Sequence, residues 1–545
     1  MTVRVGGSEN DPVASNNQAS ATVTVTGNAY NLTPTLTAIT PNAIQSGAAS
    51  TVITVTGSGF TSASTVLLSG TALSTQFTNS STMTATVPAP QLASLGWAPI
   101  SVSTPAPGGG NSNALPLSVY SVLTAGLNHM IYDPYSRNIM ASVGSGSSQI
   151  TGNSIVAINP STATFGVPVP IGSQPTNLSL TSDGQVLYTI LAGSQSIARF
   201  NMLTQAADFT YAVPTNSSFV GGIALRGIAA QPGTENTIAL DIASFTGNAI
   251  YDFDPIMKTA TIRGQASGPY SGSCIQFLDA ADLMAFDTDT SGSTLDHYTV
   301  TSAGFTYYNY QQYTTSTLNH FGCFKISGGL LFANGGGIAN PATVPATQVG
   351  TLAGASGGGT FSTWQALAPD PSLQRAFYPA STASTYGSPN DGFTAYNLNT
   401  FLPMGSVPLN MVATEGTTSY TQVDMLRWGQ DGLAILTSGG HIYLVQGAAV
   451  VPQELTQNPA AALTSSSSST ITHGSGNVLL TFTGGNFLPG VGIFWNGSYR
   501  TTTIVDATHV TAAIPASDLV STGSVSVTAV NPGAAASSAI GITIN

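Results

Sequence analysis

Charged side chains are scarce in this chain: 6% of its 545 residues are Asp, Glu, Lys or Arg, against about 25% in an ordinary globular protein. Such a composition is typical of membrane proteins, disordered chains and β proteins with a surface of hydroxyl and amide groups. No run of about 18 apolar residues is present, so no membrane-spanning helix is expected. Because 42% of the residues are hydrophobic, disorder is also excluded. A β protein with an uncharged polar surface remains.

Positive charge is particularly rare. The formal net charge is −12 and the isoelectric point is about 4.5, and the lysines are Lys258 and Lys325. No basic stripe offsets this excess of negative charge, so a nucleic-acid partner is not expected. A chain this poor in lysine and glutamate is also a poor helix former, which again favours an all-β fold.

Cysteine is almost absent, since the chain has Cys274 and Cys323 alone. Two cysteines exclude a disulfide framework and a cysteine-based zinc site. The sequence also lacks a His-x-x-x-His pair, a Gly-x-Ser-x-Gly elbow, a Walker loop and a dinucleotide fingerprint. We therefore predict no catalytic residues, no metal and no cofactor.

The first residues, MTVRVGGSEN, contain no apolar segment that could act as a secretion signal. Low charge with abundant Thr and Ser nevertheless fits secreted bacterial proteins. We expect an extracellular or cell-surface protein whose signal segment is absent from this numbering. Residues 1–33 hold a linker and one isolated strand, Ala21-Thr22-Val23-Thr24-Val25.

Short β-branched runs bounded by Gly, Pro, Asn and Ser are abundant. Residues 34–120 contain TVITVTGSGF, TMTATVPAP and PISVSTPAP, and residues 464–545 repeat the plan with NVLLTFTGGNF, GIFWNG and SVSVTAVNPG. This alternation of apolar and polar residues in short runs predicts two β-sandwiches.

Both segments resemble the TIG/IPT family of Ig-like domains. The motifs are Ile39-Thr40-Pro41, Val55-Thr56-Gly57-Ser58-Gly59-Phe60 and Pro105-Ala106-Pro107-Gly108-Gly109, then Phe482-Thr483-Gly484-Gly485-Asn486-Phe487 and Asn531-Pro532-Gly533. In the shared Gly-x-x-Phe turn, glycine permits a sharp reversal and the Phe fills one end of the sandwich. The second segment departs from the family pattern, because Ser/Thr-rich residues 464–470 stand where an Ile-x-Pro opening is usual.

Residues 121–450 contain a different repeat, in which an inner strand, a turn and a second apolar strand recur every 40–60 residues or so. The inner-strand candidates are His129–Tyr132, Asn177–Leu180, Gly227–Ala230, Cys274–Phe277, Cys323–Ile326, Gln365–Ala368 and Met425–Trp428. This period is the signature of a β-propeller. Third strands that end in Asn-Pro, Asp-Pro or Asn-x-x-Thr resemble the YVTN/NHL-like surface propellers.

The predicted architecture is therefore all-β: a propeller of about seven blades, with six or eight left open, flanked by Ig-like sandwiches. The expected boundaries are an isolated strand and linker at 1–33, a sandwich at 34–120, the propeller at 121–450, a linker at 451–463 and a sandwich at 464–545.

Several residues near the starts of the inner strands are candidates for a ligand site at the mouth of the propeller tunnel. They are His129, Arg226, His320 and Asp424. Arg226 and Asp424 are expected to form an ion pair across the mouth or to hold a small anion or sugar. A purely structural pair, with hydrogen-bonded histidines at the rim, is the simpler interpretation.

Cys274 and Cys323 begin two neighbouring inner strands, which approach each other near the propeller axis. A disulfide between them is geometrically feasible, and two buried free thiols are the alternative. An aromatic cluster lies on an outer strand of the fourth blade. Its members suit contact with carbohydrate or burial against a neighbouring module or subunit. They are Tyr307, Tyr308, Tyr310 and Tyr313.

Three functions fit these features. The first is a non-enzymatic structural or adhesive surface protein that associates with itself or with other surface proteins. In a sharper version it is a filament subunit whose strand Ala21–Val25 completes a neighbour's sheet. The second is a propeller that binds glycans or another ligand. The third, a propeller-type lyase or polysaccharide-degrading enzyme, is opposed by the shortage of acids and bases, so we expect no enzymatic activity.

Overall fold

The computed structural model describes residues 2–4, 18–20, 31–213, 224–242, 248–266, 274–286, 294–312, 323–343, 346–355, 366–380, 391–417, 420–451, 460–487, 491–506, 508–531 and 536–545. The chain divides into two compact units. The first comprises Met1–Thr40, Val52–Val87 and Pro99–Leu115, and the second comprises Pro41–Thr51, Pro88–Ala98 and Pro116–Asn545.

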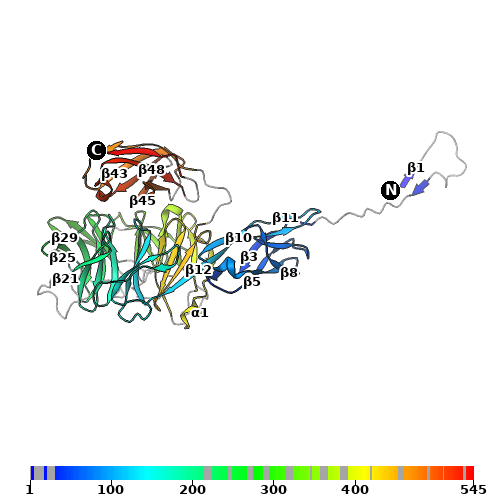
Figure 1. The fold of residues 1–545 in the computed structure, drawn as a ribbon, viewed down its shortest axis with the longest axis horizontal. Coiled ribbons are helices and arrows are strands. Elements are labelled where there is room, and N and C mark those ends of the chain that lie inside the picture. Colours follow the sequence, from blue (N-terminus) through cyan, green and yellow to red (C-terminus); the bar gives the residue numbers. More distant parts are fainter. Residues whose placement is uncertain are drawn as a thin grey trace. The chain divides into compact units, whose positions relative to one another are not determined.

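The fold is all-β, as the composition predicted (Figure 1). Within the described residues, the α-helical structure consists of α1 (Met411–Glu415). Near the N-terminus, β1 (Thr2–Arg4) pairs antiparallel with β2 (Gln18–Ser20). The predicted isolated strand Ala21–Val25 lies outside the described residues, so its pairing stays a prediction.

The first sandwich contains a sheet in the order β3-β5-β9-β8, formed by Thr35–Thr40, Thr51–Ser58, Thr82–Val87 and Ser74–Asn79. In its other sheet, β6 (Thr65–Leu68) pairs with both β10 (Gly96–Thr104) and β7 (Thr71–Ala72), and β11 (Gly110–Asn111) pairs with β10. Alternation explains the layers: in β9, Met83, Ala85 and Val87 are buried and the residues between them are partly exposed.

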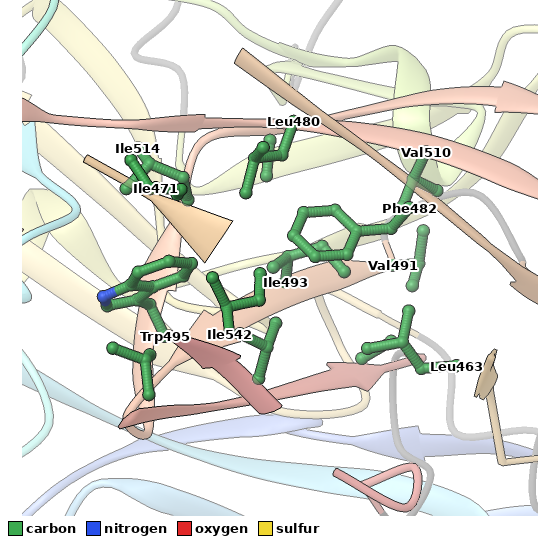
Figure 2. Packing of buried hydrophobic residues seen from close by; sticks show 14 of the residues in the cluster. Leu463, Ile471, Leu480, Phe482, Val491, Ile493, Trp495, Val510, Ile514 and Ile542 are labelled. Carbon is green, nitrogen blue, oxygen red and sulfur yellow. The ribbon is translucent and has the colours of Figure 1, made fainter. Parts of the chain in front are cut away.

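The second sandwich has one sheet in the order β41-β43-β47-β46 and another in the order β42-β49-β48-β44-β45. The first sheet comprises Ala462–Ser466, Val478–Gly485, His509–Ile514 and Thr502–Asp506. The other comprises Thr470–Ile471, Ile540–Ile544, Gly523–Val530, Gly492–Trp495 and Ser498–Arg500. Phe482, Ile493 and Trp495 pack among the aliphatic residues of its core (Figure 2).

The two sandwiches share a strand plan. β3-β5-β9-β8 corresponds to β41-β43-β47-β46, and the position of β6 between β10 and β7 corresponds to that of β44 between β48 and β45. β4 (Ala43–Gln45) runs parallel to β12 (Leu115–Thr124), as β42 does to β49. The Gly-x-x-Phe turns also match, because the residue before each Phe has a left-handed backbone: φ is 75° at Gly59 and 57° at Asn486.

The first glycine of each Gly-x-x-Phe turn is required by close packing. A Cβ on Gly57 would overlap the carbonyl oxygen of Thr35 and lie 2.7 Å from the ring of Phe60; at Gly484 it would overlap the carbonyl oxygen of Ala462 and lie 2.6 Å from Phe487. The glycine therefore lets the aromatic ring pack directly on the backbone.

Changing Gly57 or Gly484 to Ala is expected to lower the stability of the sandwich concerned by about 1–3 kcal/mol, because the ring and the strand must shift apart. Urea unfolding of the full chain would measure this. Gly485→Ala is the matched control, since a Cβ there meets no atom within 4 Å. Equal effects at Gly484 and Gly485 would contradict the packing argument.

Between the sandwiches, the chain forms antiparallel sheets one after another, each ordered as in the sequence. The first three are β13 (Leu127–Asp133), β14 (Asn138–Val143), β15 (Ser154–Asn159), β16 (Thr164–Phe165) and β17 (Val169–Pro170); β18 (Pro175–Leu180), β19 (Val186–Leu191), β20 (Ser196–Asn201) and β21 (Ala206–Ala212); and β22 (Leu225–Ala230), β23 (Thr237–Ile242), β24 (Asn248–Asp254) and β25 (Thr259–Ala266).

The next three are β26 (Cys274–Phe277), β27 (Asp282–Phe286), β28 (Thr294–Thr301) and β29 (Gly304–Gln312); β30 (Phe324–Ser327), β31 (Leu330–Ala333), β32 (Gly337–Asn340) and β33 (Thr347–Thr351); and β34 (Ala368–Asp370), β35 (Arg375–Pro379), β36 (Phe393–Asn397) and β37 (Pro403–Val407). The last contains β38 (Gln422–Trp428), β39 (Gly432–Thr437) and β40 (His441–Gln446).

The innermost strands contact one another in a closed cycle. In the described part of the chain the order is β13, β18, β22, β26, β30, β34 and β38, and β38 contacts β13. Apolar side chains fill the space between the sheets; for example, Tyr188 stacks on Phe253 of the next sheet at 5.5 Å between ring centroids. This is the ring of a β-propeller.

The last sheet takes its outer strand from the beginning of the chain. β12 pairs antiparallel with β40, with Ser121 opposite Leu444 and Thr124 opposite His441. A few residues earlier, the same strand pairs with β4, with Ser118 opposite Ala43. The predicted boundary between residues 120 and 121 therefore falls inside a continuous strand.

The repeated ends of the third strands have a physical cause. At these ends an Asn or Asp side chain accepts backbone N–H groups of the turn that follows: Asn159, Asn201, Asp254 and Asn397. Four residues later the backbone is left-handed, at Ala163, Gln205, Lys258 and Phe401. A capped turn followed by one left-handed residue fits the twist of the hairpin.

Candidate functional site

Four inner strands carry a β-bulge near their first residues. The register shifts between Leu127 and His129 in β13, Pro175 and Leu178 in β18, Leu225 and Gly227 in β22, and Gln422 and Asp424 in β38. A bulge redirects side chains and is common beside binding sites. The bulges therefore determine how polar residues are presented at one end of the propeller ring.

A hollow of about 380 Å³ lies among the inner strands. Its walls are about equally polar and apolar, and the polar side chains come from different sheets. These polar residues include His129, Asn177, Gln276, Lys325 and Asp424. A concave site in which a few polar groups converge is a usual form of a small-molecule site.

Asp424 and Lys325 form the central ion pair of this hollow. Lys325 Nζ donates to Asp424 Oδ1 at 2.8 Å and to the carbonyl oxygen of Met425 at 2.6 Å. Asp424 Oδ1 also accepts the backbone N–H of Met425 at 2.8 Å. The side chain of Asp424 is 5% exposed and that of Lys325 is 20% exposed. The pair thus links β30 to β38 and leaves the hollow without net charge.

His129 lies on the other side of Asp424, with its Nε2 atom 4.0 Å from Asp424 Oδ2. Its Nδ1 accepts the backbone N–H of Leu178 at 3.4 Å. Burial lowers the pKa of His129, an effect that Asp424 opposes and Lys325 reinforces. The imidazole is therefore neutral near pH 7, and its proton is on Nε2, facing Asp424.

Side chains of one inner strand also satisfy the backbone of the next. The bonds are Leu178 N–H to His129 Nδ1, Ala230 N–H to Ser179 Oγ and Ile326 N–H to Gln276 Oε1. Inner strands have no ladder partner on the tunnel side, so their polar groups need such acceptors. Part of the polarity of the hollow is therefore structural, and a ligand has only the remaining donors and acceptors.

The structure brings together some of the predicted tunnel-mouth residues. His129 and Asp424 face each other, whereas Arg226 is the extra residue of the β22 bulge. His320 lies outside the described residues. Asp424 pairs with Lys325, and the expected Arg226–Asp424 ion pair stays a prediction. Two signals in the sequence could have identified Lys325 as a site residue. Lysine is rare in this chain, and Lys325 lies in one of the predicted inner strands.

Cys274 and Cys323 are joined in a disulfide, with their Cα atoms 5.3 Å apart. Cys274 begins β26 and Cys323 directly precedes β30, and both are fully buried. The bond covalently links two neighbouring sheets beside the hollow.

The predicted aromatic patch lies on the outermost strand of its sheet, β29. The ring of Tyr307 packs edge-on against Tyr298, at 5.6 Å between centroids. The side chains of Tyr308 and Tyr310, and all of Tyr313, lie outside the described part of the structure. A contact surface at this cluster therefore stays a prediction.

Sequence reasoning overlooked a buried acidic residue near the ring closure. Glu415, at the end of α1, has a side chain that is 1% exposed and lies 3.0 Å from His441 Nδ1. It also accepts hydrogen bonds from Thr437 Oγ1 at 2.6 Å and Tyr443 OH at 3.2 Å. Burial raises the pKa of Tyr443, and the nearby Glu415 raises it further. These contacts hold α1 against β39 and β40.

Within the described ranges, no group of three or more His, Cys, Asp or Glu side chains is arranged to hold a metal ion. Among the same residues, no helix has the length and apolar character needed to cross a membrane.

The lowered pKa of His129 makes a prediction about pH. The folded state prefers the neutral imidazole, so the unfolded chain binds more protons as the pH falls through 6.5, the ordinary histidine value, towards the lower folded pKa. The free energy of unfolding should therefore fall in this window. In His129→Gln this loss should be smaller. Urea midpoints at pH 7.5 and 5.0 would show it, with His473→Gln, at an exposed position, as control. Equal losses in His129→Gln and the wild type would contradict the assignment.

Comparison with known proteins places part of this architecture in a family. Residues 34–119 match the IPT/TIG domain. The match confirms the first of the two resemblances seen in the sequence. No curated protein matches the chain.

Several solved structures are similar in fold. Hydrazine synthase of Kuenenia stuttgartiensis is 13% identical, with a TM-score of 0.43 over 60% of this chain and 96% of that chain. The Cps50 (Swd1) β-propeller domain of Myceliophteria thermophila is 10% identical, with a TM-score of 0.43 over 59% and 96%. A functionally unknown protein from Desulfotomaculum acetoxidans is 13% identical, with a TM-score of 0.40 over 57% and 92%. These likenesses concern the fold alone.

The TIG domain match ends at Val119, but its last strand does not. β12 continues to Thr124 and forms the outer strand of the last propeller sheet. The residues that follow the family match thus continue the same strand into the last propeller sheet.

Proposed function

We propose that this chain is a non-enzymatic, adhesive protein of the cell surface, in which the propeller is the binding part and the sandwiches are spacers. The second sandwich is then a second TIG domain, and the propeller is of the YVTN/NHL type. The shared strand plan and the paired Gly-x-x-Phe turns support the second TIG domain. The capped turns that end the third strands support the propeller type.

The observation that carries the proposal is the hollow among the inner strands. It has a volume of about 380 Å³ and presents polar groups from several sheets on bulged strands. Its size falls in the range of about 300–1,000 Å³ that is usual for small-molecule sites. A ring of packed sheets holds these groups at fixed separations, which favours specific binding.

Two further features support a place outside the cell. Disulfides persist in oxidising compartments, and this chain uses both of its cysteines in one. A surface rich in hydroxyl and amide groups, with 6% charged residues, is also in keeping with secretion.

Adhesion can be tested with the fluorescently labelled full chain on a glycan array and on fixed bacterial cells. Asn177→Trp would fill part of the hollow and should reduce binding at least tenfold. Leu203→Trp, at a turn residue that is 83% exposed, is the control and should bind like the wild type. A wild-type chain that binds neither surface, or an Asn177→Trp variant that binds unchanged, would refute the proposal.

The filament version remains a separate proposal, because Ala21–Val25 lies outside the described residues. Electron microscopy of native material is its test: ordered fibres with this strand inserted in a neighbour would support it, and isolated monomers would exclude it. A lyase or polysaccharide-degrading activity has no specific observation in its favour among the described residues.

A further inference from the structure

We infer that the hollow binds an uncharged polyhydroxylated ligand, such as a neutral saccharide unit, with one ligand hydroxyl held between His129 Nε2 and Asp424 Oδ2. This inference rests on the proposed binding role of the propeller and specifies the chemistry of its site.

The 4.0 Å separation between His129 Nε2 and Asp424 Oδ2 is the first argument. It is too long for a direct hydrogen bond, which spans about 2.7–3.2 Å. An oxygen placed about 2.8 Å from both atoms would form two hydrogen bonds of ordinary length, with an angle of about 90° between them at the oxygen. The gap therefore accepts a group of the size of one hydroxyl.

The second argument is the direction of the hydrogen bonds. His129 Nδ1 accepts the Leu178 N–H, so a neutral imidazole carries its hydrogen on Nε2 and donates into the gap. Asp424 Oδ1 is occupied by Lys325 and by its own neighbour Met425, which leaves Oδ2 as the acceptor. A ligand group in the gap must therefore accept a hydrogen bond from His129 and donate one to Asp424. A hydroxyl does, whereas a carboxylate cannot donate and an ammonium cannot accept.

Charge gives the third argument. Lys325 neutralises Asp424 within a largely buried pair, so the hollow has no net charge from these residues. An anionic ligand would approach the Asp424 carboxylate, and a cationic one would approach the Lys325 ammonium. Burying an unpaired charge in such a place is costly, which favours an uncharged ligand.

Gln276 supplies a further donor for a second hydroxyl. Its Oε1 is fixed by the Ile326 N–H at 2.8 Å. The orientation of the amide is therefore set, and its NH₂ group is left to donate to a ligand. A ligand with several hydroxyl groups can use this donor together with the His129–Asp424 gap.

Calorimetry with the full chain tests the inference. The probes are the methyl glycosides of glucose, galactose and mannose, with glucuronate and glucosamine as charged counterparts. We expect at least one neutral glycoside to bind at least tenfold more tightly than either charged sugar. Gln276→Glu keeps the acceptor for Ile326 but removes the NH₂ donor and adds a charge, and it should weaken binding at least tenfold.

Gln174→Glu is the matched control, because the Oε1 of Gln174 accepts from Ser145 at an exposed position away from the hollow. Thermal melts establish that each variant is folded, and Asp424→Asn tests the His129–Asp424 gap itself. Tighter binding of a charged sugar, or unchanged binding in Gln276→Glu and Asp424→Asn, would overturn the inference. If the wild type adheres to glycans or cells but ignores these neutral sugars, the ligand class is wrong while the adhesive role stands. If it adheres to nothing, the proposed function itself fails.

Discussion

Replacing both Val122 and Leu123 with proline is expected to open the propeller ring and to lower its free energy of unfolding by more than about 3 kcal/mol. These residues lie opposite Tyr443 and Ile442 in the β12–β40 ladder. Proline has no backbone N–H. In an antiparallel ladder alternate residues donate to one neighbour, so two successive prolines remove the N–H group that donates to β40. The last sheet then loses the strand that completes it.

Urea unfolding followed by tryptophan fluorescence in a variant that keeps Trp428 as its single tryptophan is the measurement, since this side chain is 4% exposed and lies in the last sheet. Val167→Pro, in the connection between β16 and β17 at a position that is 84% exposed, is the control and should unfold like the wild type. If the double-proline variant keeps the wild-type midpoint, the ring does not depend on β12 for closure.

Removing the disulfide by Cys274→Ala and Cys323→Ala is expected to destabilise the propeller by about 2–4 kcal/mol. The two cysteines are 49 residues apart, and a cross-link over a loop of this length restricts the unfolded chain by roughly that free energy. Both side chains are fully buried, so alanine also leaves a small gap. The urea midpoint under non-reducing conditions should therefore decrease.

Reductant separates the effect of losing the cross-link from the effect of the gap that alanine leaves. Dithiothreitol should lower the midpoint of the wild type towards that of the double variant and should leave the double variant unchanged. A wild type that is insensitive to reductant even after unfolding and refolding in its presence would show that the bond does not stabilise the ring.

Much of the fold could be predicted from local sequence. The alternation in TMTATV and the Gly-x-x-Phe turns identify sandwich strands, because one face of each strand must be apolar and the turn must admit an aromatic ring. Most inner strands of the propeller were also recognisable as short runs followed by a turn. The sixth candidate, Gln365–Ala368, was placed too early, because β34 comprises Ala368–Asp370. Because alternate residues of a strand face the core, burial produces an alternation of apolar and polar residues that can be read from the sequence.

The site was harder to predict, because its contacts depend on which strands face one another around the ring. Arg226 and Asp424 occupy matching places in their repeats, yet Asp424 pairs with Lys325 from a different inner strand. Local sequence does not show which carboxylate on another inner strand lies within reach of a lysine side chain. The continuity of β12 was missed for a related reason: the boundary between the first sandwich and the propeller was placed after residue 120, where the backbone continues its strand.

The course of β12 also affects the order of events during synthesis. Thr124 leaves the ribosome about 320 residues before its partner His441, which at 5–20 residues per second is a delay of roughly 16–60 s. During this interval β12 lacks its partner strand β40. An unpaired strand edge can associate with other chains. The propeller is therefore a late-closing ring, and a stalled or truncated nascent chain lacking residues 422–446 would expose an adhesive edge.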